Sequence, residues 1–214
     1  MTNVDLHNRA WILGLVVIAY WAGLRPLSKQ NAHALVFLAN SLAPIYDDAG
    51  IETRVIKHKH GPFYPDAQWD LDRMVGQGLL SIHDVHLSKT EENWWLDAAY
   101  IPTAAGRNVF SRCRELPLLK RSTGFLVELV NAFASLSAKG RDQAALKDAI
   151  YAIPGRPNLS PLVFENIEDN YSTMTANAFE KLAGSEISLS PKERLQLYFG
   201  YLAHRVETTG GQKS

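Results

Sequence analysis

Apolar positions repeat at helical spacing along most of the chain. Residues 6–23 are apolar around almost the whole circumference, which is typical of a helix buried in a core or at an interface. Residues 35–42 carry a narrower apolar stripe, typical of an amphipathic helix. Ser28 is the predicted N-cap of this helix. Further helices are predicted over residues 104–115, 119–137, 146–153, 174–182 and 190–206. The pattern predicts a mainly α-helical protein.

One stretch interrupts the helical pattern. Residues 54–60 alternate like a short strand, and Gly61-Pro62 ends it. A short helix then begins at Pro65-Asp66, where proline and a carboxylate suit the first turn. Two strand-like runs joined by a polar turn follow over residues 79–87 and 94–101. Strand, helix and hairpin in this order are typical of a winged helix.

These elements divide the chain into two expected parts. We predict a winged-helix domain with a small β-hairpin wing over residues 1–115. We predict a helical domain packed on it over residues 116–214, in which Ser190-Pro-Lys-Glu193 forms a capping box. The fold class expected is therefore mainly α.

Charge and cysteine content narrow the classes of function. Lys plus Arg and Asp plus Glu number 22 each, so no net charge draws the chain to nucleic acid or to an anionic membrane. The single cysteine, Cys113, excludes an intramolecular disulfide and favours a reducing cytoplasm. The apolar run 10–24 is shorter than the roughly 20 residues that span a bilayer. A buried helix is favoured over a signal peptide or an anchor.

Three groups of residues could carry chemistry. His58 and His60 could meet His83 and His86 as zinc ligands if their strands paired, although such histidines more often form a polar surface. Cys113 has an arginine on each side, which could lower a thiol pKa.

The third group is acidic. Asp66, Asp70 and Asp72 share one short helix and could hold a divalent cation, although a solvated helix face is favoured. None of the three groups has a catalytic spacing. We expect no catalytic residue, no cofactor and no metal site.

The short helix predicted from Pro65 has two different faces. Leu71, Met74, Val75 and Leu79 share the apolar face. The opposite face holds Asp66, Trp69, Asp70, Arg73 and Gln77, and its acidity disfavours sequence-specific reading of DNA.

An exposed tryptophan is typical of an interface, but Trp69 could equally pack beneath the helical domain. Phe63, Tyr64, Trp69 and Arg73 are the predicted partner-binding residues. The preceding basic run could contact a nucleic-acid backbone through Arg54, Lys57, His58, Lys59 and His60.

Several motifs together resemble a known family. They are Leu27-Ser28, His33-Ala-Leu-x-x-Leu-Ala39, Val55-Ile-Lys-His58, Gly61-Pro-Phe-Tyr-Pro65, Gln68-Trp-Asp-Leu-Asp-Arg-Met-Val75 and Gly78-Leu-Leu80. The pattern resembles the middle components of bacterial ABC-three-component, Lamassu-like anti-phage systems over residues 24–105. The turn and the helix after it also resemble the Panacea domain of antitoxins.

The resemblance implies a non-catalytic adaptor in a cytoplasmic hetero-oligomer. Such a subunit bridges or restrains an SMC/Rad50-like ABC ATPase and an effector, often a nuclease, and touches DNA weakly or only through the complex. The alternative is a winged-helix DNA-binding antitoxin or transcriptional regulator. A small metal enzyme built on the histidines is a third reading.

Overall fold

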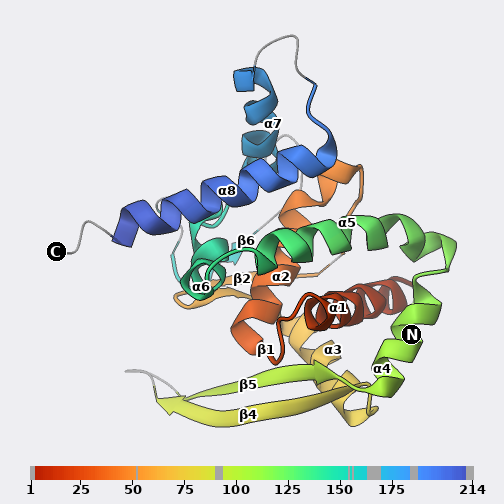
Figure 1. Cartoon of the computed structure of the whole chain (residues 1–214). Helices are drawn as coiled ribbons and strands as arrows, with labels where there is room; N and C mark the ends of the chain where they lie inside the picture. Colours follow the sequence, from red (N-terminus) through yellow and green to blue (C-terminus); the bar gives the residue numbers. More distant parts are fainter. Residues whose placement is uncertain are drawn as a thin grey trace.

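The protein is mainly helical (Figure 1). The structure is a computed structural model that describes residues 3–51, 53–89, 94–153, 155, 157–162, 170–183 and 188–210. Its α-helices are α1 (Asn3–Trp21), α2 (Lys29–Leu42), α3 (Pro65–Gly76), α4 (Ala104–Cys113), α5 (Pro117–Ala134), α6 (Ala138–Lys147), α7 (Tyr171–Ala183) and α8 (Pro191–Gly210). A 3₁₀ turn, η1 (Ala43–Tyr46), extends the end of α2.

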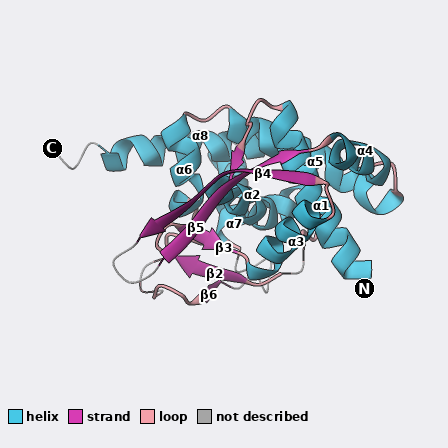
Figure 2. Cartoon of the chain, turned by 90° about the horizontal axis from the view of Figure 1, so that it is seen from below, coloured by secondary structure: helices cyan, strands magenta, loops and turns pink. Residues whose placement is uncertain are grey.

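Two small antiparallel sheets accompany the helices (Figure 2). The first has the strand order β1-β5-β4 and consists of β1 (Leu27–Ser28), β4 (Leu80–Lys89) and β5 (Trp94–Pro102). The second has the order β3-β2-β6 and consists of β2 (Val55–His58), β3 (Gly61–Phe63) and β6 (Pro161–Leu162). The predicted hairpin is present as β4 and β5, and its turn, residues 90–93, lies outside the described residues.

The strand expected over residues 54–60 does not join the hairpin sheet. It forms β2, which pairs with β3 and β6, whereas the third strand of the hairpin sheet is β1. A two-residue strand is too short to show any alternation, so its role could not be predicted from the pattern.

Helix α1 lies at the centre of the fold. Every residue from Trp11 to Ala19 is buried. It contacts α2, α3, α4, α5, β1 and β5, which surround it on all sides. The prediction of a buried helix is confirmed for Trp11–Ala19, whereas Leu6 and Trp21 nearer the ends of α1 are exposed. No helix among the described residues is long and apolar enough to cross a membrane.

Helices α2 and α8 begin directly after the capping residues that the sequence predicts. The Ser28 hydroxyl accepts a hydrogen bond from the Asn31 amide at the start of α2. The predicted capping box is confirmed at α8, where the Ser190 amide donates to Glu193 and the Glu193 amide donates to the Ser190 hydroxyl. Both helix starts were therefore determined by local sequence.

The helix predicted over residues 146–153 is wrong. Helix α6 begins earlier, behind the Ser137 cap, and ends at Lys147. Gly140 lies in the first turn of α6 and is buried. The apolar residues after Lys147 are buried because the chain turns into the core there, and not because they form a helical stripe.

That turn is organised by Asp148, which is completely buried. Its carboxylate accepts hydrogen bonds from the Ser172 hydroxyl of α7 (2.8 Å) and the Tyr198 hydroxyl of α8 (2.8 Å). It also accepts from the backbone amides of Ile150 and Tyr151. Burial raises the pKa of Asp148, and these hydrogen bonds oppose that rise. One carboxylate thus joins three segments of the second half of the chain.

One buried hydrophobic cluster spans both parts that were predicted from the sequence. It includes Trp11 of α1, Leu71 of α3, Phe133 of α5 and Leu202 of α8. The helical second half therefore shares one hydrophobic core with the first half. The boundary near residue 115 stays a prediction.

Replacing Asp148 by alanine is expected to destabilise the fold strongly. The substitution leaves two hydroxyl groups and two amides buried without their acceptor, so we expect a loss of about 3 kcal/mol or more in the free energy of unfolding. For a chain of this size that loss corresponds to a fall of roughly 10 °C in melting temperature. Asp142→Ala, at an exposed position on α6, is the matched control and should melt like the unaltered protein. Equal melting of both variants would contradict the role given to Asp148.

Candidate functional site

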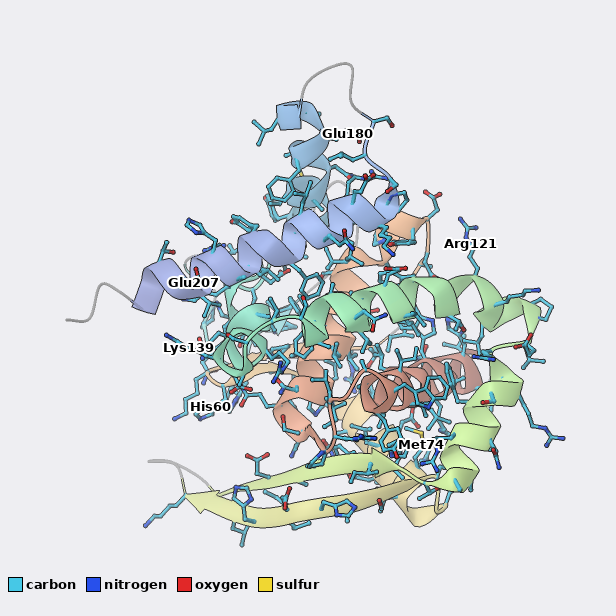
Figure 3. The ribbon with its side chains drawn as sticks, in the orientation of Figure 1. His60, Met74, Arg121, Lys139, Glu180 and Glu207 are labelled. Atoms are coloured by element: carbon cyan, nitrogen blue, oxygen red, sulfur yellow. The ribbon has the colours of Figure 1, made fainter. Side chains whose placement is uncertain are left out.

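A pocket of about 250 Å³ opens where three distant segments meet. Its walls come from the start of α2, the turn between β2 and β3, and the outer part of the β4–β5 hairpin. The lining residues are Lys29, Gln30, His33, His58, His60, Gly61, Pro62, Phe63, Lys89 and Asp97. Figure 3 shows His60, one of these residues, at the edge of the molecule.

Lys29 fixes the hairpin side of the pocket. Its ammonium donates a hydrogen bond to the backbone oxygen of Leu96 on β5 (3.0 Å) and lies 5.8 Å from the centre of the Phe63 ring. Burial lowers the pKa of Lys29, while the nearby carboxylates of Asp97 and Asp72 raise it. The ammonium is thus held in a defined place between the hairpin and α2.

The turn between β2 and β3 forms the opposite wall. Gly61 has a φ of 131°, a backbone conformation that side-chain-bearing residues rarely adopt. The Tyr151 hydroxyl donates to the backbone oxygen of His58, and the His58 amide donates back to that hydroxyl (3.2 Å). The Tyr151 amide also donates a hydrogen bond to the buried carboxylate of Asp148. The pocket wall is therefore connected to the second half of the chain.

A chain of hydrogen bonds starts at His33, which is buried and lines the pocket. The Tyr64 amide donates to His33 Nδ1 (3.3 Å), so the proton of the neutral ring lies on Nε2 and is donated to Gln68 Oε1 (3.0 Å). The Gln68 amide group then donates to Asp72 (2.8 Å) and to the Tyr100 hydroxyl (3.0 Å). His33 and Gln68 belong to the family-like motifs, and here both serve to join α2, α3 and β5.

His33 is held in its neutral form. Burial lowers its pKa to about 4, the hydrogen bond to Gln68 raises it, and the charge of Lys29 lowers it further. A neutral His33 suits the single-proton pattern of hydrogen bonds described above. The residue therefore acts as a structural connector at neutral pH and is not a proton donor for a ligand.

Helix α3 presents its outer face away from this network. Trp69 is 60% exposed, and the Arg73 guanidinium lies 4.9 Å from the centre of its ring. This excludes the alternative in which Trp69 packs beneath the helical domain. Asp70, predicted to share the exposed face, is instead buried and pairs with Arg9 of α1 (2.9 Å). The helical spacing could not predict the burial of Asp70, because its partner Arg9 lies 61 residues earlier in the chain.

Two predicted partner-binding residues lie elsewhere. Tyr64 is completely buried, which places it in the core and corrects its assignment to a contact surface. Phe63 is half-buried, and its ring lies 4.9 Å from the His33 ring in the pocket. Trp69 and Arg73 alone among the four lie on the exposed face of α3.

The four histidines considered as zinc ligands do not come together as paired strands. His58 and His60 belong to the β2–β3 sheet, whereas His83 and His86 lie on β4 in the other sheet. His83 bonds with Ser81, and His86 donates to the backbone oxygen of Asp84. Among the described residues, no group of three or more histidine, cysteine or acidic side chains could hold a metal ion.

The candidate acidic site and thiol are also dispersed. Asp66 faces Arg54 (3.8 Å), Asp70 pairs with Arg9, and Asp72 accepts from Gln68, so the three carboxylates have separate partners. Burial raises the pKa of Cys113, which opposes the activation that flanking arginines could have provided.

The basic residues between positions 54 and 60 differ in their exposure to solvent. Arg54, Lys59 and His60 are exposed, as expected for groups that could reach a phosphate backbone. Lys57 lies over the Tyr151 ring, 5.5 Å from its centre, and His58 is half-buried. The run thus supplies both an exposed edge and one wall of the pocket.

Sequence reasoning missed four pocket residues. They carry no motif of their own, are separated by up to 68 positions, and are Lys29, Gln30, Lys89 and Asp97. The one local signal was the Ser28 cap, which places Lys29 at the first turn of a helix. Their convergence depends on how β5 pairs with β1 and β4, and spacing along the chain does not reveal that.

The buried neutral His33 predicts acid sensitivity. Its pKa is about 4 in the folded protein and near 6.5 when exposed, so below pH 6.5 the unfolded chain takes up a proton that the folded chain refuses. The free energy of unfolding is therefore unaffected by this proton above pH 6.5 and falls by about 3 kcal/mol as the pH drops to 4. Chemical denaturation at pH 7 and pH 4.5 measures it, and His33→Gln should show a smaller difference between the two. An equal pH dependence in both proteins would contradict the assignment.

Comparison with known proteins gives no relative: no family model matches the chain, and neither a curated protein nor a solved structure matches it.

Proposed function

We propose that this chain is a non-catalytic adaptor subunit of a bacterial anti-phage complex. It would bridge or restrain an SMC-like ABC ATPase and a nuclease effector in the cytoplasm, as part of a hetero-oligomer. The observation that carries the adaptor role is the exposed Trp69, held by Arg73 on the outer face of α3. The identity of the partners comes from the sequence resemblance over residues 24–105.

A winged-helix fold is part of the proposal. The order α1-β1-α2-α3-β4-β5, with β1 added to the edge of the β5–β4 hairpin, supports it. In this arrangement α3 takes the place of the recognition helix and the hairpin that of the wing. The β2–β3 hairpin is then an insertion between α2 and α3.

The wing and α3 carry apolar groups that suit a protein partner. Leu87 and Leu96 are directly paired across the hairpin, and both are exposed, as is Val85 at the irregular part of β4. Aromatic and apolar groups such as these, with an arginine beside them, are typical of protein interfaces. The adaptor reading therefore has two neighbouring elements with contact residues.

A winged-helix DNA-binding antitoxin or regulator is the second candidate. The element order and the exposed Arg54, Lys59 and His60 favour it. Against it, the exposed residues of α3 include Asp66 and Asp72, which would repel phosphates. The balance of charges over the whole chain also removes the electrostatic attraction that such proteins use.

Trp69→Ala tests the partner surface. The side chain is largely exposed, so we expect the melting temperature to stay within a few degrees. A tryptophan at an interface centre contributes about 2 kcal/mol or more, so affinity for the co-expressed ATPase or effector should fall roughly thirtyfold. Co-purification and phage protection measure this.

Trp21→Ala is the matched control, since Trp21 is also half-exposed but lies at the end of α1 beside Phe110. It should leave assembly unchanged. If Trp69→Ala folds and still assembles normally, the contact surface on α3 is wrong.

The isolated protein is expected to lack turnover and strong DNA binding. With no net charge, it should bind duplex DNA only weakly, in the range of about 10⁻⁴ to 10⁻⁶ M typical of non-specific contacts, and lose that binding as salt rises. It should neither hydrolyse ATP nor cut DNA. Fluorescence anisotropy at two salt concentrations and nucleotide hydrolysis assays measure these properties. A salt-resistant dissociation constant near 10⁻⁸ M for one sequence would favour the regulator.

A further inference from the structure

The pocket between α2, the β2–β3 turn and the β4–β5 hairpin gathers nitrogen-bearing groups that the adaptor role does not use. Lys29 enters from α2, His58 and His60 from the β2–β3 turn, and Lys89 from the end of β4. The groups come from three separate parts of the chain and surround one hollow of about 250 Å³. Their arrangement is therefore a property of the tertiary structure.

The electrostatic balance of this pocket is positive. Two lysines line it against one carboxylate, Asp97, among the described lining residues, and His33, His58 and His60 add imidazole groups. The first turn of α2 also lies in the wall, so the positive end of the helix dipole adds to the field. Burial lowers the pKa of His58, and the charges of His60 and Lys59 lower it further, so this imidazole serves as a neutral hydrogen-bond donor.

The types of donor favour phosphate over carboxylate. Ammonium and imidazole groups on several sides suit a tetrahedral anion with three terminal oxygens. Planar carboxylates are typically held by the fork of an arginine, and the lining, as far as the structure describes the chain, holds none. Phe63 and Pro62 supply an apolar wall beside these donors, suitable for a ring carried by the phosphate.

From this combination we propose that the pocket binds a terminal phosphate monoester joined to a ring, in the manner of a nucleoside 5′-monophosphate. Lys29, Lys89 and the imidazoles of His58 and His60 hold the phosphate, and Phe63 contacts the ring. The volume is slightly below the range of about 300–1,000 Å³ usual for larger ligands, so one nucleotide unit is the size that fits. A free nucleotide and the 5′-phosphate end of a nucleic-acid strand share this chemistry.

Calorimetric titration of the full chain at low salt tests the proposal. Adenosine 5′-monophosphate should bind, inorganic phosphate should bind more weakly, and adenosine should not bind. Absence of any heat or amide NMR shift with the monophosphate up to about 10 mM, a concentration that reveals affinities weaker than 1 mM, overturns it. Equal binding of adenosine and its monophosphate overturns it too, because the phosphate would then contribute nothing.

Charge-removing variants locate the site. Lys29→Gln and Lys89→Gln should each weaken binding of the monophosphate about tenfold, the effect of losing one charged hydrogen bond. Lys89 is exposed, so its variant keeps the test valid if Lys29→Gln disturbs the contact to Leu96. Lys120→Gln is the matched control: Lys120 is exposed and precedes Arg121, which lies on the other side of the molecule from His60 in Figure 3. Equal affinity in all four proteins overturns the proposal.

A pair of short single-stranded oligonucleotides distinguishes the two sources. If a 5′-phosphorylated strand binds more tightly than the free monophosphate and the same strand with a 5′-hydroxyl does not, the ligand is a nucleic-acid end. If the free monophosphate binds at least as well, the ligand is a nucleotide. Equal binding of both strands overturns the proposal in favour of contacts to the internal backbone. Assembly through Trp69 is independent of every one of these results.

Discussion

The whole fold depends on hiding one helix from water. Nine consecutive residues of α1, from Trp11 to Ala19, are buried, and a helix without a polar face is stable in water only when it is covered on all sides. Helices α2, α3, α4 and α5 and strands β1 and β5 provide that cover. The hairpin and α3 pack against it, so the proposed partner surface lies on elements that contact this buried helix. The pair between Arg9 and Asp70 ties α3 to α1 at the edge of this buried layer.

Two buried polar groups then give the surrounding elements a defined arrangement. His33 joins α2 to α3 and, through Gln68, to Tyr100 of β5. Asp148 joins the end of α6 to α7 and α8. Apolar packing alone tolerates small shifts between elements, whereas a buried donor or acceptor that loses its partner costs free energy. Tyr151 connects Asp148 to the β2–β3 turn, so contacts made in the C-terminal half hold the pocket wall in place.

The two proposed binding surfaces present different kinds of side chain. The outer face of α3 and the hairpin offers Trp69, Arg73 and exposed leucines, which suit a protein partner. The pocket offers ammonium and imidazole groups in a confined space, which suits a small anion. Lys29 contacts both regions, because it lines the pocket and bonds to the backbone of the hairpin at Leu96. A ligand at the pocket would therefore lie beside the part of the hairpin that carries Leu87 and Leu96.

Local sequence determined the features that depend on neighbours along the chain. The buried α1, the caps at Ser28 and Ser190, the start of α3 at Pro65 and the β4–β5 hairpin follow from periodicity and capping, which act over a few residues. Helical spacing placed Trp69 opposite the apolar face of α3, but only the structure decided that it is exposed. Tertiary structure alone decided the burial of Asp70 and Tyr64, the end of α6 before Asp148, the pairing of β1 with β5 and the convergence of Lys29, His58 and Lys89. Each of these depends on a partner tens of residues away, and the free energy of such a contact leaves no periodic trace in the sequence around either residue.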